Sequence, residues 1–127
     1  MESQLIALIN QERANQGMGA LTQQSQLTAA AQGHSQDMAC NNIFSHTGSN
    51  GSNLSDRMAA QGYVFSAVAE NIAAGYGTAQ DVFNGWMGSQ GHRDNMLNSV
   101  YTQVGIGYAF TSTSDFGTYW TANFGTP

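Results

Sequence analysis

Apolar residues recur with a helical period in the first part of the chain and give way to strand-like segments at its end. Leu5, Leu8 and Ile9 follow one helix face, and a second stripe runs over Leu27–Met38. The final segments "TQVGIGYAF" and "TYWTANF" are strand signals, joined by the turn-rich "TSTSDFG". Helices first and a hairpin last predict an α+β domain built in layers, and 127 residues suit a single domain over residues 1–127.

Turn and cap residues predict where these elements begin and end. Gly17 breaks the first helical pattern, and Ser25 is a candidate cap for the second. Residues 45–53 are expected to form a loop, followed by a short helix over Leu54–Gln61 that Gly62 ends.

Two further elements follow before the hairpin. The segment "YVFSAVAENIA" is rich in aromatic and β-branched residues and predicts a strand or extended chain. Thr78 with Asp81 three residues later is typical of a helix start, and that helix carries Val82, Phe83 and Trp86.

Charge is sparse, and its balance excludes several classes of partner. The chain has three Arg, no Lys and eight acidic residues, giving a net charge of −5. Nucleic-acid binding and attraction to anionic membranes therefore lack an electrostatic driving force. No apolar run approaches the ~20 residues that span a bilayer. We expect no transmembrane segment, and an export signal already removed from this chain.

The three histidines lie in different contexts. His34 falls on the apolar stripe of the second helix, where a hydrogen-bonded core residue is expected. His46 lies in the loop after Phe44, where it could meet a ligand. His92 follows Gly91 at the start of a new turn, and Ser89 could cap that helix.

Glu70 interrupts a nearly apolar stretch in a chain that has few charges, and a carboxylate there needs a partner. It could accept backbone N–H bonds from a neighbouring loop or belong to a site. No local zinc motif joins His46, Glu70 and His92, so spacing alone predicts such a site only weakly.

Neither candidate nucleophile is supported by its surroundings. Ser89 lacks the first glycine of a nucleophile elbow, because Met87 stands there. Cys40 ends a helix without an evident base, and we expect a buried or semi-buried bystander thiol; as the single cysteine it excludes an internal disulfide.

Motifs spread along the whole chain resemble the CAP superfamily of cysteine-rich secretory, antigen 5 and pathogenesis-related 1 proteins, in particular its disulfide-free bacterial SCP-like branch. They are, in order, "LINQERANQG", "LTAAAQGHSQDMA", "FSHTGSNGSNLSDRMAAQGY", "AENIAAGYGTAQDVFNGWMGSQGHRDNML", "YTQVGIGYA" and "YWTANFG". The resemblance implies a three-layer α-β-α sandwich with a central antiparallel sheet and an open cleft.

The resemblance also implies which residues line that cleft. The "FSH" histidine is His46, the "AEN" glutamate is Glu70 and the "GHR" histidine is His92, with Ser89 nearby. His46 and His92 would hold Zn²⁺ or another divalent cation weakly, with an open face. Many eukaryotic relatives carry a second glutamate where Ser89 stands, so the acidic set is one short unless Asp94 replaces it.

Three functions follow as hypotheses. The leading one is a monomeric, secreted or cell-surface module whose cleft binds a peptide, a cell-wall component or a lipid, with a metal as helper. The alternative is a zinc-dependent hydrolase or peptidase in which Glu70 is the catalytic general base. A third is a purely structural cluster that attaches the "FSHTG" loop to the sheet.

Overall fold

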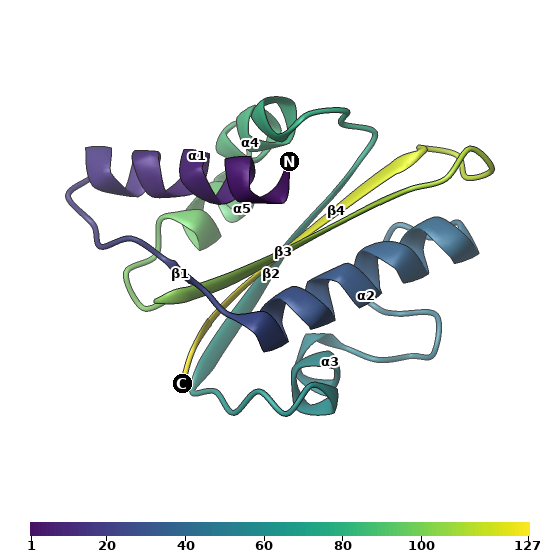
Figure 1. Ribbon diagram of the computed structural model, residues 1–127, viewed down its shortest axis with the longest axis horizontal. Coiled ribbons are helices and arrows are strands. Elements are labelled where there is room, and N and C mark those ends of the chain that lie inside the picture. Colours follow the sequence, from purple (N-terminus) through teal and green to yellow (C-terminus); the bar gives the residue numbers. More distant parts are fainter.

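A four-stranded sheet with helices on both faces forms the domain, and the computed structural model describes all residues, 1–127 (Figure 1). The helices are α1 (Glu2–Asn15), α2 (Ser25–Asn41), α3 (Leu54–Ala60), α4 (Ala79–Met87) and α5 (Gln90–Met96). The strands are β1 (Thr22–Gln23), β2 (Ala67–Ala74), β3 (Gln103–Phe110) and β4 (Thr118–Thr126). The predicted α+β sandwich is confirmed.

The strands lie in the order β1-β3-β4-β2, so β2 is an edge strand. The pairs β2–β4 and β3–β4 are antiparallel, as predicted. The difference from the predicted sheet is β1, which pairs in parallel with β3. Because β1 contains two residues, its sequence carries no alternation that could have revealed it.

The larger part of the core lies between the sheet and α1, α4 and α5, which stand above the sheet in Figure 1. Leu5 and Ile9 of α1 face the sheet, which confirms the first predicted stripe. The largest buried side chains in this layer include Trp86, Trp120 and Phe124. Their burial removes much apolar surface from water and attaches α4 to the sheet.

Arg13 connects α1 to the segment that follows α5. Its buried guanidinium donates hydrogen bonds to four backbone carbonyl oxygens, those of Gly19, Met96, Asn98 and Tyr101, at 2.8–3.1 Å. A buried charge whose donors are satisfied in this way holds the end of α5 in place.

Helix α2 lies on the opposite face so closely that β3 has room there only for glycine. A Cβ atom on Gly105 would collide with the backbone of Thr28, and one on Gly107 would collide with the backbone of Ala31. These two glycines therefore set the separation between α2 and the sheet. Leu27 and Met38 of α2 pack on either side of this contact, together with Met58 of α3.

The predicted helix boundaries hold, but two of the predicted caps, Ser25 and Ser89, do not. Thr78 accepts a hydrogen bond from the backbone N–H of Asp81, and Gly62 follows α3 with φ +76°. Ser25 is not the cap of α2. Gln24 is, because its side-chain oxygen accepts from the N–H groups of Gln26 and Leu27.

Two expectations on accessibility have different outcomes. No helix is long and apolar enough to cross a membrane, as expected. The expectation that Cys40 is buried or semi-buried is wrong, because this thiol is exposed in the last turn of α2.

Candidate functional site at the edge strand

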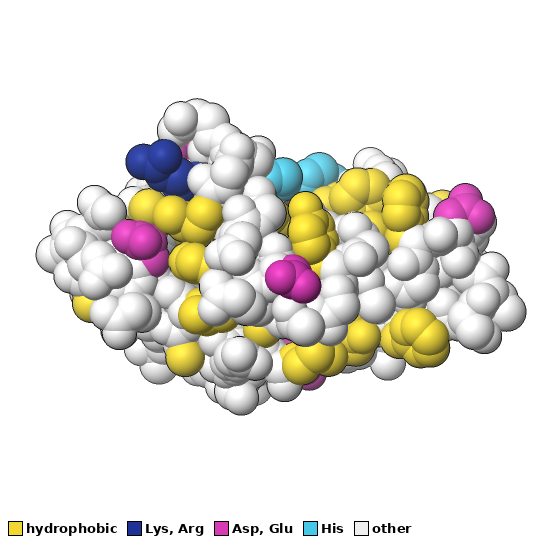
Figure 2. Space-filling model, turned by 90° about the horizontal axis from the view of Figure 1, so that it is seen from above, with side chains coloured by type: hydrophobic (Ala, Val, Ile, Leu, Met, Phe, Trp, Pro, Cys, Tyr) yellow, Lys and Arg dark blue, Asp and Glu magenta, His cyan; other side chains and the backbone are white.

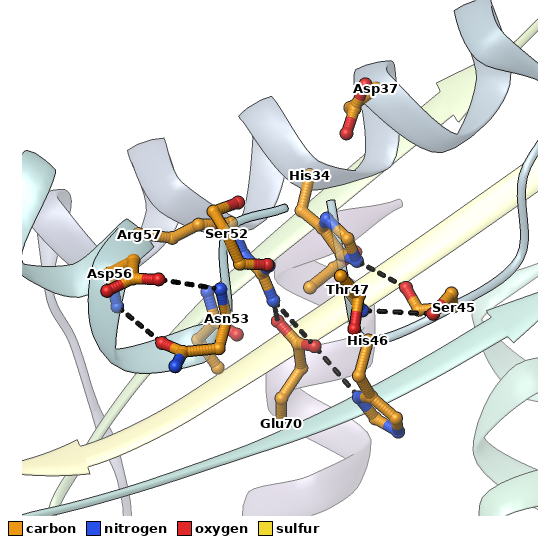
Figure 3. A network of polar contacts seen from close by, with 12 residues as sticks. His34, Asp37, Ser45, His46, Thr47, Ser52, Asn53, Asp56, Arg57 and Glu70 are labelled. Atoms are coloured by element: carbon orange, nitrogen blue, oxygen red, sulfur yellow. Dashed lines mark hydrogen bonds and ion pairs between the residues drawn. The ribbon is translucent and has the colours of Figure 1, made fainter. Parts of the chain in front are cut away.

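Glu70 lies in the middle of β2, paired in register with Asn123 of β4, and its side chain is 2% exposed. Figure 3 shows Arg57 and His46 approaching its carboxylate from two sides. Nη2 of Arg57 lies 3.0 Å from Oε1 and 2.8 Å from Oε2, and Nδ1 of His46 lies 2.9 Å from Oε1. With its amide oriented to suit both neighbours, Asn123 also donates to Oε2 at 3.0 Å. The partners of Glu70 are thus side chains rather than loop N–H groups.

The loop between α2 and α3 brings His46 to Glu70. Helix α2 ends at Asn41, and the next residue, Asn42, turns the chain away with a φ of 51°. His34 then donates a hydrogen bond from Nε2 to the carbonyl oxygen of Ser45, the residue before His46, at 2.8 Å. His34 is 1% exposed, which confirms the expected hydrogen-bonded core histidine. The hydrogen bond from His34 to Ser45 also fixes the backbone position from which the His46 side chain extends.

His92 reaches the same edge of the sheet from the opposite helical layer. Asn71 of β2 donates to the backbone oxygen of His92 at 3.0 Å, which attaches α5 to the edge strand. The ring of His92 lies 6.3 Å, centroid to centroid, from that of Trp86. Ser89 precedes α5 but makes no side-chain cap; its Oγ lies 3.0 Å from Nδ1 of His92.

His46 and His92 share one electrostatic environment. Burial lowers the pKa of His92, and electrostatic interaction with the nearby His46 lowers this pKa further. The His46 side chain is 61% exposed. Figure 2 shows histidine side chains gathered on one face, beside apolar side chains.

An apolar groove of about 280 Å³ runs beside the edge strand next to His92. Trp86 closes part of the edge, because its indole N–H donates to the carbonyl oxygen of Ile72 at 3.1 Å. The groove is lined by Phe44, Ile72, Ala73, Ala74, Tyr76, Gly85, Trp86, Ser89 and His92. Ser89 and His92 of the predicted cleft line this groove, whereas His46 and Glu70 do not; that any of the four binds a ligand stays a prediction.

The set of acidic residues that the family resemblance implies for the cleft stays one residue short. Asp94 is exposed on α5 and accepts a hydrogen bond from Gln90 at 2.7 Å. No three or more His, Cys, Asp or Glu side chains lie close enough together to hold a metal ion. Glu70 orients the His46 ring through Nδ1.

The arrangement leaves one nitrogen free on each imidazole. A carboxylate that pairs with Arg57 can only accept, so His46 donates through Nδ1, and in the neutral ring the lone pair would lie on Nε2. If Nδ1 of His92 donates to Ser89, its Nε2 is free in the same way. A hydrogen bond on the other side of the ring in this way orients an imidazole.

Arg57 is the site residue that the sequence reasoning missed. Its side chain is 10% exposed, and it also donates to the backbone oxygen of Ser52 at 3.0 Å. A signal was present, because Arg57 is the only Lys or Arg between Arg13 and Arg93, and Glu70 needed a partner.

Comparison with known proteins identifies the family of this fold. A sequence model described as the cysteine-rich secretory protein family, CAP, matches residues 6–124. The chain belongs to the CAP family. The resemblance of its motifs is thereby confirmed, although this CAP domain has a single cysteine.

Three proteins illustrate the range of similar CAP domains and folds. The uncharacterized protein YkwD of Bacillus subtilis is 36% identical over 97% of the chain. An extracellular SCP-domain protein of Bacillus anthracis superposes with a TM-score of 0.88 at 33% identity over 99% of the chain. An outer surface protein of Borrelia burgdorferi shares the fold, with a TM-score of 0.88 at 21% identity; the match covers 98% of this chain and 90% of that protein. The chain spans 46% of YkwD and 40% of the B. anthracis protein, less than half of each.

Proposed function

We propose that this CAP domain is a binding module, secreted or at the cell surface, whose groove beside β2 takes an apolar group of a ligand while His46 and His92 meet its polar part. The observation that carries the proposal is the apolar groove with His92 in its wall, while His46, held by Glu70, lies close enough to His92 to act on it electrostatically. The extracellular and outer-surface relatives support the location.

The size of the groove favours a peptide among the expected ligands. A volume of about 280 Å³ lies just below the range of small-molecule sites, roughly 300–1,000 Å³. It suits one aromatic or branched side chain better than a lipid tail. Trp86 and Tyr76 offer aromatic surface, and Phe44, which is 48% exposed, forms an open wall.

A divalent cation such as Zn²⁺, held by the Nε2 atoms of His46 and His92, would assist ligand binding. When bound, it would add a positive centre that attracts a carboxylate or carbonyl oxygen of the ligand. Glu70 holds the His46 ring through Nδ1, and Ser89 does the same for His92. With two protein ligands we expect weak binding and a fold that persists without the cation.

The hydrolase alternative gains no support from this geometry. Glu70 is 2% exposed, and both of its oxygens accept hydrogen bonds from Arg57. A general base needs an oxygen that a water molecule can approach. Catalysis by Glu70 stays a prediction, which a search for chelator-sensitive cleavage of peptide and ester panels would test.

Calorimetric titration with Zn²⁺ tests the cation site. Wild-type protein should bind Zn²⁺, whereas folded His46→Ala and His92→Ala proteins should lose the signal. The matched control is Asp94→Asn, which removes a nearby exposed carboxylate and should bind as wild type does. Equal binding by all four proteins would contradict the site.

A second experiment tests the groove with tripeptides that carry a central Phe, Leu or Ser. The Trp86 indole N–H signal in NMR spectra should shift with the Phe or Leu peptide and not with the Ser peptide. Phe44→Ala should weaken this shift, whereas Phe110→Ala, which removes an exposed aromatic outside the groove, should not. No shift with any peptide would exclude a peptide as the ligand of the groove.

Light scattering would test the expectation that the protein is a monomer.

A further inference from the structure

A second, polar pocket lies between α2, α3 and the loop that joins them, outside the groove just described. Its volume is about 230 Å³. Small residues of the two helices form its walls, namely Ala29, Ala30, Gly33 and Ala60. The chemistry of this pocket comes from His34, Asp37 and Arg57, which also line it.

His34 presents a buried acceptor without a partner to this pocket. A carbonyl oxygen can only accept, so the bond to Ser45 requires the proton on Nε2 of His34. The neutral ring then carries a lone pair on Nδ1, and this buried atom has no hydrogen-bond partner. Burial lowers the pKa of His34, which keeps the ring neutral near pH 7. A buried polar atom of this kind is normally satisfied by a ligand or by water.

Arg57 presents a buried donor without a partner. Nη1 donates to the Ser52 carbonyl and Nη2 to Glu70, but Nε has no acceptor. Figure 3 shows the His34 ring descending from α2 and Arg57 crossing from α3, with Ser52 between them. A group that donates to Nδ1 of His34 and accepts from Nε–H of Arg57 would satisfy both. A hydroxyl group can do both.

The charges around the pocket favour a neutral ligand. Burial raises the pKa of Asp37, but hydrogen bonds from Ser49 and Asn41 outweigh it and leave this pKa below its usual value. Asp37 is therefore an anion, and it would repel a negative ligand. Arg57 would repel a positive one, and its own charge is already paired with Glu70.

We propose that this pocket binds a small neutral polyhydroxyl ligand, of the size of one sugar residue. Hydroxyl groups would bridge His34 and Arg57, a further hydroxyl would donate to Asp37, and the C–H surface would rest on the alanine walls. The volume far exceeds the ~30 Å³ that one water molecule occupies in the liquid. The ligand is either a free sugar or a residue of a glycan chain, and both present the same hydroxyl pattern.

NMR titration tests the proposal with three probes: glucose, N-acetylglucosamine and the N-acetylglucosamine trimer. Arg57 is one of three arginines and His34 one of three histidines, so their Nε–H and Nδ1 signals can be assigned. We expect a saturable shift of both signals with at least one probe. Saturation by a monosaccharide indicates a free sugar as the source, and saturation by the trimer alone indicates a glycan chain. No shift, or shifts that do not saturate, would mean that the pocket holds ordered water only and would overturn the proposal.

Gly33→Leu provides a variant that blocks the pocket without a folding penalty. A Cβ atom on Gly33 meets nothing within 4 Å, and the position is helical and exposed. This variant should abolish sugar binding, while Ala14→Leu, at an exposed position of α1, should bind as wild type does. Undiminished binding by Gly33→Leu would refute the assignment. His46→Ala should keep sugar binding, so failure of the cation site and failure of this pocket give different results.

Discussion

Arg57 and Glu70 join α3 to the edge strand through one guanidinium nitrogen that lies 3.0 Å and 2.8 Å from the two carboxylate oxygens. Both side chains are at least nine-tenths buried, so neither charge can be satisfied by water. This pair connects the two sites, because Glu70 orients His46 and Arg57 lines the polar pocket.

Arg57→Leu should lower the free energy of unfolding by about 3–5 kcal/mol, because it leaves the Glu70 charge buried without its partner. Urea denaturation followed by circular dichroism measures this. Arg93→Leu, at an exposed position of α5, is the control and should change stability by less than ~0.5 kcal/mol. Equal denaturation midpoints for the two variants would show that the pair contributes little.

Glu70→Gln should weaken Zn²⁺ binding by about 10- to 100-fold, because an amide holds the His46 ring less firmly than a carboxylate does. The measurement is the Zn²⁺ titration described above, on protein confirmed to be folded. A Glu70→Gln protein that binds Zn²⁺ as tightly as wild type would remove Glu70 from its orienting role. Loss of a hydrolytic turnover with Zn²⁺ binding unchanged would instead support the general-base alternative.

Gly107→Ala should destabilise the domain by roughly 1–3 kcal/mol or more, because the added methyl group forces α2 away from β3. Gly33→Ala makes the same chemical change on exposed helix surface and should stabilise by up to ~1 kcal/mol. Thermal unfolding of the two variants should therefore move in opposite directions. Similar midpoints would mean that α2 can shift without cost.

Stability should fall as the pH decreases below about 6.5, in part through His34. Burial lowers the pKa of His34 from 6.5, so between its folded and unfolded pKa values the unfolded chain binds the proton and the folded chain does not. This contribution is fully present above pH 6.5 and is lost as the pH falls toward the folded pKa. Of the charged groups that face His34, Glu70 and Asp37 raise this pKa and Arg57 lowers it, but burial has the largest effect.

Urea denaturation at several pH values, repeated on His34→Gln, isolates this contribution from those of the other histidines. The amide can still donate to Ser45 but does not titrate. The pH dependence should be shallower in His34→Gln than in wild type. Identical slopes would show that the His34 ring does not resist protonation.

The sequence predicts the elements well where side-chain periodicity is strong. The stripes of α1 and α2 follow from burial on one face, which a local window can detect, whereas β3 and β4 are buried on both faces and show as runs of strand-forming residues. Gln24 was overlooked as a cap because Ser25 is the commoner capping residue type. Strand β1 depends on its pairing with β3 rather than on its own residues.

The candidate site was predicted in part, and the missing part is tertiary. His46, Glu70 and His92 were singled out by family motifs, and the carboxylate in an apolar stretch indicated a need for a partner. Arg57 lies thirteen residues before Glu70, on a different element, and only the docking of α3 against β2 brings the two together. Neither periodicity nor spacing encodes that contact.

The two glycines of β3 that face α2 make the contact between this helix and the sheet rigid. Where Gly105 and Gly107 stand, backbone rests on backbone, so no side chain between α2 and the sheet can rotate to absorb a displacement. Helix α2 is thereby the rigid base from which the His46 loop projects. Amide hydrogen exchange should be slowest where α2 contacts β3. Conformational adaptation to a bound ligand must come from the His46 loop or from α4 and α5.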